Sequence, residues 1–276
     1  MKTVSDASGN LVEFAGVLAA LMAASSALIC CASDAPRDAA GVEISPDAAV
    51  QTPADAATGS AVDAAVETPT AVKRVAIMPL GDSITAGAHS STDAGYRAEL
   101  WKRMLGMTGY SVDFVGSNRS GQLPDVDNEG HSGWRIDQIT ANIDGWLATY
   151  KPDIVLLHIG TNDMARDYNV ATAPDRLSAL VDKIAADVPG ITIVVAQIVP
   201  TLYAVINARV ETFNDAISAI VRSKVSQGKK VRLVDMYHAI GKSDFYDTLH
   251  PNDTGYAKMA DVWYSDLEKI LAEKGP

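Results

Sequence analysis

The sequence has little cysteine, and neither cysteine stands where it could cross-link a folded domain. Cys30 and Cys31 are adjacent near the amino terminus, and no other cysteine follows them. Neighbouring cysteines rarely bridge each other, so the rest of the chain is predicted to fold without a disulfide. The five histidines are spread along the chain. No histidine and cysteine cluster therefore offers the three or four ligands of a metal site, and we predict none.

Basic residues are also scarce. The chain has 23 lysines and arginines against 34 aspartates and glutamates, a formal net charge of −11. No basic stretch with interleaved aromatic residues occurs, which argues against a nucleic-acid partner. Residues 32–71 hold seven acidic residues against one arginine, so more than half of the net negative charge lies there. For that reason the acidity says little about what the rest of the chain binds.

Charged residues are absent from residues 14–31, FAGVLAALMAASSALICC. Such a run has about the length of a signal-peptide core with its flank, and it is short for a membrane span. We predict that residues 1–31 are a signal peptide or a lipoprotein signal, with Cys30 or Cys31 lipidated. The chain is then a secreted protein or a bacterial cell-envelope lipoprotein, attached to a membrane only through that lipid. A buried alanine-rich helix is the alternative.

Large side chains are rare in residues 32–71, which consist mainly of Ala, Asp, Pro, Thr and Val. Such a segment buries too little apolar surface to offset the entropy lost on ordering. We therefore predict a disordered linker at 32–71 and one folded domain at 72–276. The oligomeric state is left open.

Strand-like and helix-like patterns alternate from residue 72 onward, which predicts a parallel sheet with crossover helices. The expected fold class is α/β, a three-layer α/β/α sandwich with a flavodoxin-like, five-stranded parallel sheet. Strands are expected at 75–78, 112–116, 153–159, 191–196 and 231–234. Helices are expected at 95–107, 135–150, 174–188, 208–224 and 252–273, with a long polar loop at 117–134.

A serine follows the first expected strand. The apolar run Val75–Met78 ends at Pro79, and Gly81, Asp82 and Ser83 come next. Open α/β sheets bind their ligands at the carboxyl ends of strands, which is where this order places Ser83. A serine there is a nucleophile if a base reaches its hydroxyl and hydrogen-bond donors await the oxyanion.

Asp247 and His250 form an Asp-x-x-His pattern in the loop before the last expected helix. On a tight turn, this spacing lets the carboxylate meet Nδ1 of the imidazole and leaves Nε2 free to face a serine. The carboxylate then holds the tautomer and stabilises the imidazolium that forms on proton abstraction. The pattern is weak by itself, and its value comes from its place on the expected active face.

Two further residues offer donors for an oxyanion. Asn162 follows the expected strand 153–159, and its side-chain amide can donate; the alternative is a turn residue that bonds its own backbone. Gly133 precedes an expected helix, and no Cβ blocks the approach of a substrate to its N–H. The N–H of Ser83 is the third donor.

The four blocks Gly81-Asp82-Ser83, Gly133, Gly160-x-Asn162-Asp163 and Asp247-x-x-His250 resemble, in order, those of the SGNH hydrolases, also called the GDSL esterase/lipase superfamily. The resemblance covers nearly all of residues 72–271. It implies Ser83 as nucleophile, His250 as base and Asp247 as its orienting carboxylate. It also implies an oxyanion hole made of Ser83, Gly133 and Asn162, and no cofactor.

The details MPLGDSIT, EGHSGW and GTND resemble carbohydrate esterase family 3, which includes acetylxylan esterases. Asp82, His131 and Trp134 are therefore candidates for substrate binding. Each has a structural alternative: Asp82 holding the turn, His131 making a structural hydrogen bond, and Trp134 packing at a helix start. His89 is a candidate to line the cleft, and His158 is expected in the core.

The expected function is hydrolysis of O-acyl, above all O-acetyl, esters of a carbohydrate such as acetylated xylan. A lipid-directed esterase, lysophospholipase or thioesterase on the same fold is the alternative, because residues 199–206 are somewhat apolar. A non-catalytic, surface carbohydrate-binding module is the alternative from another class.

Overall fold

The computed structural model describes residues 72–275, and the predicted signal segment 1–31 and linker 32–71 lie outside the described residues. One seven-stranded sheet has the order β3-β4-β1-β5-β6-β7, with β2 also beside β1. Every pair is parallel except β3 with β4. The strands are β1 (Lys73–Gly81), β2 (Tyr110–Phe114), β3 (Asn118–Arg119), β4 (Asp127–Gly130), β5 (Ile154–His158), β6 (Thr192–Gln197) and β7 (Val231–Asp235).

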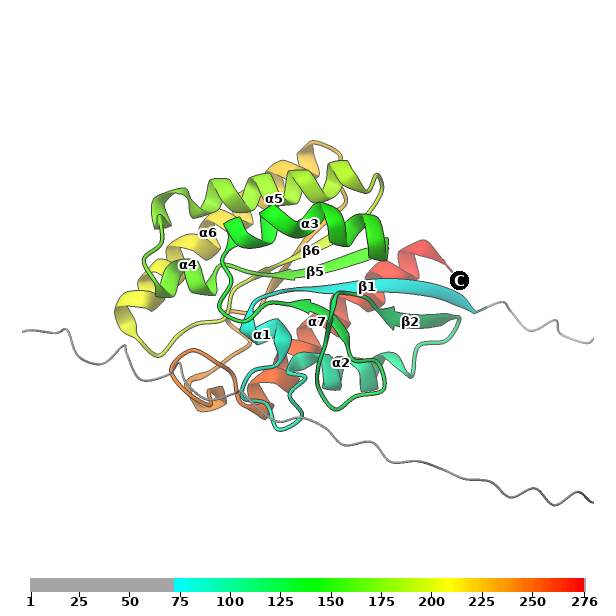
Figure 1. Ribbon diagram of the computed structural model, residues 1–276, viewed down its shortest axis with the longest axis horizontal. Coiled ribbons are helices and arrows are strands. Elements are labelled where there is room, and N and C mark those ends of the chain that lie inside the picture. Colours follow the sequence, from blue (N-terminus) through cyan, green and yellow to red (C-terminus); the bar gives the residue numbers. More distant parts are fainter. Residues whose placement is uncertain (1–71, 276) are drawn as a thin grey trace, which may run out of the picture. The chain divides into compact units, whose positions relative to one another are not determined.

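Helices cover both faces of the sheet (Figure 1). On one face lie α3 (Ile136–Tyr150), α5 (Ala173–Asp187) and α6 (Ala204–Ser226), and on the other α2 (Tyr96–Met104) and α7 (Asp253–Lys274). The predicted three-layer α/β/α sandwich and its five long helices are confirmed, but the predicted five-stranded parallel sheet is corrected to seven strands with one antiparallel pair. Short turns of helix complete the list: α1 (Ser83–Ala86), α4 (Thr161–Ala165), η1 (Val170–Thr172) and η2 (Lys242–Asp244).

Strand β1 is the centre of the core because its side chains alternate between the two layers. Met78 and Leu80 join the apolar cluster under α3, α5 and α6. Val75 and Ile77 join the cluster under α2 and α7. All four are at most 2% exposed, and burying each contributes about 1.5–3 kcal/mol. A strand buried on both faces is apolar throughout, which is why the sequence indicated it clearly.

The predicted polar loop at 117–134 contains two strands that the sequence analysis missed, β3 and β4. Strand β4 reads Asp-Asn-Glu-Gly and has no apolar side chain, yet Asn128 and Glu129 are fully buried. It pairs with the end of β1, where Leu80 lies opposite Glu129 and Gly81 opposite Gly130. This strand exists because of tertiary pairing, which composition does not reveal.

The register of the sheet brings two chain segments side by side. Gly81 at the end of β1 lies opposite His158 at the end of β5. A Cβ on Gly81 would lie 2.2 Å from the carbonyl oxygen of His158, so only glycine fits there. The segments after these strands, which carry Ser83 and Asn162, therefore leave the sheet at the same edge.

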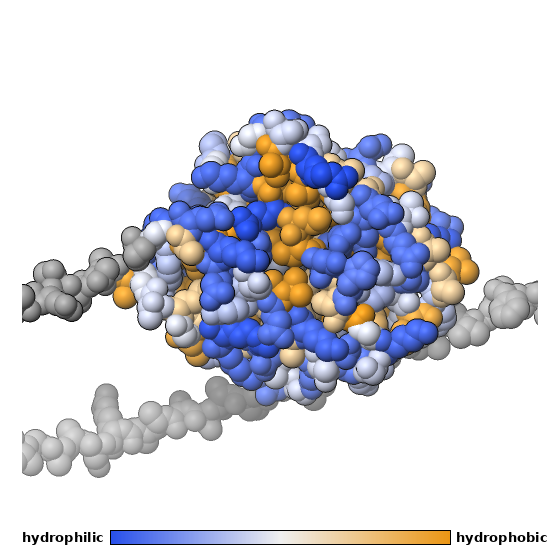
Figure 2. Space-filling model, turned by 180° about the vertical axis from the view of Figure 1, so that it is seen from behind, coloured by the Kyte–Doolittle hydropathy of each residue, from blue (hydrophilic) through white to orange (hydrophobic). Residues whose placement is uncertain are grey.

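The surface seen from behind is mostly hydrophilic, with hydrophobic residues gathered near its middle (Figure 2). Single exposed apolar residues are normal on folded proteins and do not by themselves mark a site. Between residues 72 and 275, no helix has the length and hydropathy that crossing a membrane requires.

Candidate active site

Ser83 is the first residue of the short helix α1. The carboxylate of Asp82 caps this helix by accepting a hydrogen bond of 3.0 Å from the N–H of Ile84. The helix ends at Gly87, whose φ of 100° is a conformation that suits glycine. A tight turn with a cap at both ends holds the serine at the edge of the sheet. Its Oγ lies 2.9 Å from Nε2 of His250, which is 167 residues away in sequence.

His250 is oriented by Asp247 as the sequence spacing suggested. Oδ2 of Asp247 lies 2.9 Å from Nδ1 of the imidazole. Oδ1 accepts from the backbone N–H groups of Leu249 and His250, each at 2.7 Å. Partial burial acts to raise the pKa of Asp247, but these hydrogen bonds hold it below its usual value. The carboxylate therefore stays ionised beside the imidazole, as an orienting anion should.

The loop that carries this pair is tied to the rest of the domain. The carbonyl oxygen of Thr248 accepts from the N–H of Leu202 and the hydroxyl of Thr201, both at 2.9 Å. The N–H of Tyr246 donates to the carbonyl of His250 at 2.9 Å. These bonds fix the imidazole against the serine with little freedom to move.

The two remaining donors of the expected oxyanion hole, Gly133 and Asn162, lie on segments that hydrogen bonds hold near the serine turn. His131 N–H donates to the carbonyl of Gly81 at 2.9 Å, which places the loop holding Gly133 beside the serine turn. Asn162 is buried, and its side-chain amide donates to the carbonyl of Trp134 at 3.0 Å, which leaves its second amide hydrogen for another acceptor. Gly133 has a φ of +79°, and within residues 72–275 its N–H meets no acceptor.

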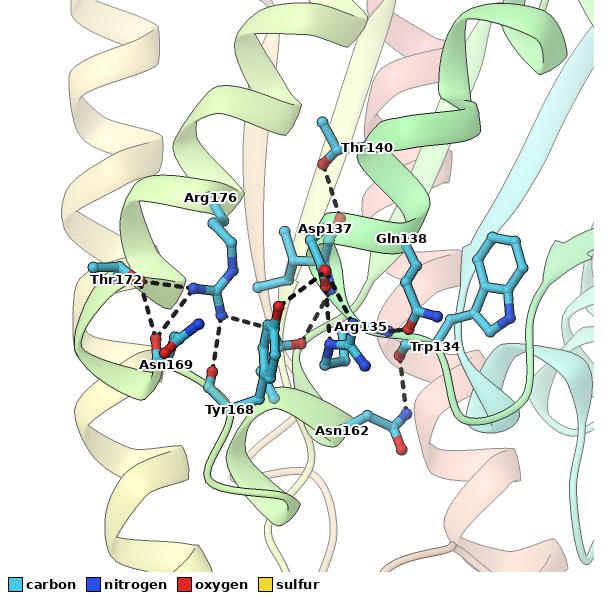
Figure 3. Close-up of polar contacts among 12 residues, drawn as sticks. Trp134, Arg135, Asp137, Gln138, Thr140, Asn162, Tyr168, Asn169, Thr172 and Arg176 are labelled. Atoms are coloured by element: carbon cyan, nitrogen blue, oxygen red, sulfur yellow. Dashed lines mark hydrogen bonds and ion pairs between the residues drawn. The ribbon is translucent and has the colours of Figure 1, made fainter.

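A polar cluster that the sequence largely did not reveal lies near Asn162 (Figure 3). The buried carboxylate of Asp163 accepts from Arg176 at 2.8 Å and from the N–H of Ile136 at 3.1 Å. Burial raises the pKa of Asp163, against the effect of the Arg176 hydrogen bond. The guanidinium of Arg135 lies 4.0 Å above the ring of Tyr168. These contacts lock α4 to the start of α3.

The structure favours the turn-holding alternative for Asp82 over contact with a substrate. Its side chain is fully buried behind Ser83, and burial raises its pKa to about 6, against the lowering effect of the Ile84 hydrogen bond. The capping contact supports the alternative that it holds the turn. Sequence position beside the nucleophile does not distinguish a residue facing the cleft from one facing the core.

The rings of His131 and Trp134 stack on each other and are therefore not freely exposed in the cleft. The ring of His131 stacks on those of Trp134 and Trp146, with centroids 4.2 and 4.7 Å away. Its Nε2 lies 2.6 Å from the buried carboxylate of Glu129. The structure therefore favours the structural hydrogen bond for His131, and its contact with a substrate stays a prediction. For Trp134, which packs partly buried against the core, contact with substrate stays a prediction.

His158 and His89 have opposite environments. His158 is fully buried, as expected of a core residue, and burial lowers its pKa to about 4, so that it stays neutral. His89 is partly exposed and lies beside the triad, with Nε2 at 3.6 Å from Oδ2 of Asp247.

Sequence spacing missed one group of three side chains of the kinds that bind metals: His89, Asp247 and His250, whose nearest atoms lie within 4.8 Å of one another. Both nitrogens of His250 already face other partners, Asp247 and Ser83. We assign no metal to these residues, because an ion there would displace those contacts.

Comparisons with known proteins agree with this geometry. The model of the GDSL-like Lipase/Acylhydrolase family matches residues 80–258. The Clostridium thermocellum family 3 carbohydrate esterase has 39% sequence identity and a TM-score of 0.67, over 74% of this chain and all of that one. A putative endoglucanase X of Acetivibrio thermocellus is 37% identical over 50% of this chain and 61% of its own length. A multidomain esterase of Ruminococcus flavefaciens is 32% identical over 73% of this chain and 30% of its own. The chain thus spans less than two thirds of these two curated relatives.

Proposed function

Because the chain belongs to the GDSL-like Lipase/Acylhydrolase family, we propose that it is a serine esterase that removes acetyl groups from a carbohydrate. The observation that carries the proposal is one continuous line of contacts. Ser83 Oγ lies 2.9 Å from Nε2 of His250, and Nδ1 of the same ring lies 2.9 Å from Asp247. Nucleophile, base and orienting carboxylate are thus within hydrogen-bond reach in the order that acyl transfer requires.

Acylation begins when His250 Nε2 takes the hydroxyl proton of Ser83 while Oγ forms a bond to the ester carbonyl carbon. The N–H groups of Ser83 and Gly133 and the free amide hydrogen of Asn162 donate to the oxygen that becomes negative. Each such donor contributes roughly 10²–10³ in rate. His250 then gives its proton to the leaving sugar oxygen as the bond from the carbonyl carbon breaks.

Deacylation runs through the same residues in reverse. His250 takes a proton from water, the resulting hydroxide attacks the acyl carbon, and the proton returns to Ser83 as acetate leaves. Asp247 stays ionised throughout and stabilises the imidazolium in each half of the reaction. This cycle balances without a metal or an organic cofactor.

Carbohydrate is the proposed substrate because the Clostridium thermocellum family 3 carbohydrate esterase is 39% identical in sequence to this chain. The lip of the site also carries Tyr246, an aromatic side chain on a residue that is 65% exposed, and aromatic faces suit the apolar side of a sugar ring. Secretion, or a lipid at Cys30 or Cys31, would bring the enzyme to polymer outside the cell, and this remains a proposal.

One observation favours the second candidate, an esterase of longer acyl chains. A cavity of about 660 Å³ adjoins the catalytic loop, and its lining includes Leu202, Ile240 and Phe245. Leu202 is 43% exposed and is bonded to Thr248 of that loop. A series of 4-nitrophenyl esters decides between the candidates: the first predicts the highest kcat/KM for acetate, the second for chains of about six carbons or more.

Replacing the nucleophile tests the proposal. Ser83→Ala is expected to lower kcat on 4-nitrophenyl acetate and on acetylated xylan by roughly 10⁴–10⁶-fold. Ser91→Ala, a change at an exposed serine outside the triad, serves as the matched control. A folded Ser83→Ala protein that keeps its turnover would refute the mechanism. Polysaccharide binding without acetate release by the wild-type protein would instead support the non-catalytic binding module.

A further inference from the structure

His89 lies against the triad in a position that the mechanism above does not use. Its ring stacks on Tyr246, with centroids 4.6 Å apart and planes 12° apart. The ring of His250 is also near, with its centroid 4.9 Å away and its plane tilted by 58°. Nε2 of His89 lies 3.6 Å from the same Asp247 oxygen that contacts His250, which is longer than a hydrogen bond. Two imidazoles thus flank one carboxylate.

The backbone sets this position, although the side chain is 43% exposed. His89 has a φ of 62°, in the left-handed region that side chains other than Gly, Asn and Asp seldom adopt. The turn around it is pinned, because the hydroxyl of Tyr256 donates to the carbonyl of Ala88 at 2.6 Å. Ser90 Oγ also donates to the carbonyl of Gly87 at 2.9 Å. An unusual backbone conformation aims the ring at Asp247.

We propose that His89 is a positioning residue that shares the triad carboxylate with His250 and sets the lowest pH at which His250 still acts as a base. This inference rests on the proposed function in one respect, the role of His250. His89 touches no reacting atom; it acts through Asp247.

The charges around His89 give the sign of the effect. Asp247 is the carboxylate that faces both rings, and Tyr246 and Tyr256 are neutral phenols. On α7, Asp253 is engaged with the N–H of Ser91 at 2.8 Å, and Asp82 is buried behind the serine. One carboxylate stabilises one neighbouring imidazolium well and two poorly, because the two cations repel each other.

A proton on His89 therefore opposes a proton on His250, and the base form of His250 persists to lower pH. Repulsion between two unit charges about 5 Å apart, at a partly exposed site, is expected to move the midpoint of the acidic limb by about half a pH unit to one unit.

The test compares pH profiles of kcat/KM on 4-nitrophenyl acetate. His89→Asn removes the imidazole and keeps a residue that tolerates a positive φ. It is expected to raise the midpoint of the acidic limb by about half a pH unit to one unit. His89→Lys supplies a permanent cation and is expected to lower the midpoint. His238→Asn is the matched control, since His238 pairs with Asp235 at 2.7 Å elsewhere on the surface, and its midpoint should equal that of the wild type.

An unchanged midpoint in His89→Asn, or a shift in the same direction in both His89 variants, would overturn the proposal. A lower rate at every pH with the midpoint unmoved would also overturn it, since a purely structural role predicts that result. NMR titration of the His250 ring in Ser83→Ala and in Ser83→Ala/His89→Asn measures the same shift without any turnover. The proposed function fails separately, if Ser83→Ala remains an active esterase.

Discussion

The pattern Asp-x-x-His occurs twice in this chain, and the two copies have the same local structure. In both, the aspartate accepts from the backbone N–H of the histidine, at 3.0 Å from His238 to Asp235 and at 2.7 Å from His250 to Asp247. In both, the second carboxylate oxygen faces Nδ1, at 2.7 and 2.9 Å. Only His250 has a serine at its other nitrogen, Ser83. Local spacing therefore sets the hydrogen bonds between aspartate and histidine, and the rest of the fold determines whether a serine contacts the histidine.

Burial separates the two pairs as clearly as the serine does. The side chain of His238 is 76% exposed and that of His250 is 16% exposed. An exposed ion pair contributes little, because water and salt screen its charges. The same contact at the less exposed His250 sets the tautomer of the ring that faces Ser83. Substitutions at the two pairs should therefore differ widely in their effect on kcat.

Replacing each of the two histidines with alanine should give the greatest difference in kcat between the two Asp-x-x-His pairs. His250→Ala is expected to lower kcat by roughly 10⁴–10⁶-fold, because no group remains to accept the proton of Ser83. His238→Ala is expected to leave kcat within about twofold. Steady-state kinetics on 4-nitrophenyl acetate measures both, and comparable losses in the two proteins would contradict the contrast.

Replacing the two aspartates with asparagine comes next. Asp247→Asn keeps the shape but favours the wrong tautomer of His250, and kcat should fall by about 10³–10⁴-fold. Asp235→Asn should leave kcat unchanged, because His238 has no serine to serve. If Asp247→Asn keeps more than about a tenth of the wild-type rate, the orienting role is wrong.

The oxyanion donor gives an intermediate effect. Asn162→Ala should lower kcat by about 10²–10³-fold with a smaller change in KM, because its amide acts chiefly on the transition state. Asn142 provides the control: it is an exposed asparagine whose amide donates to the carbonyl of Gln138 at 2.9 Å. A loss in Asn162→Ala that lies entirely in KM would place the amide in ground-state binding instead.

The smallest effect concerns stability and the buried carboxyl of Asp82. Its pKa in the folded protein is raised from 3.8 to about 6. The folded state then binds more protons than the unfolded state between these values, so stability falls as the pH rises through them. Asp82→Asn removes this ionisation. Its free energy of unfolding relative to the wild type should therefore be roughly 1–3 kcal/mol higher at pH 8 than at pH 4.

Urea unfolding at the two pH values measures that difference for Asp82→Asn. The exposed counterpart Asp235→Asn should change stability by less than about 0.5 kcal/mol at either pH. Equal pH dependence in the wild type and Asp82→Asn would show that burial does not perturb this carboxyl.

Much of the fold was predictable because its main elements are set locally. The buried strands β1 and β5 are short apolar runs between turn residues, and helix α3 has isoleucines at helical spacing. The missed strand β4 owes its place to pairing with β1 and to the buried Glu129, which bonds Ser117 and His131. Such long-range pairing leaves no periodic mark in the sequence.

The candidate site was predictable to the same extent. Ser83, Asn162, Asp247 and His250 follow strands or turns, so their common edge could be inferred. The sequence also indicated Asp163 as a support for the Asn162 loop, but not its partner Arg176, because that contact joins separate elements through side chains.

The main strands and helices, the two Asp-x-x-His turns and the capped turn that bears the serine follow from the sequence alone, because these depend on neighbours within a few residues. Tertiary packing set the pairing of β3 and β4, the contact of the His250 ring with Ser83, the burial of Asp82 and the position of His89 beside the carboxylate that His250 contacts. Those outcomes depend on strand register and on packing between residues as much as 167 positions apart, and spacing along the chain carries no record of such distances.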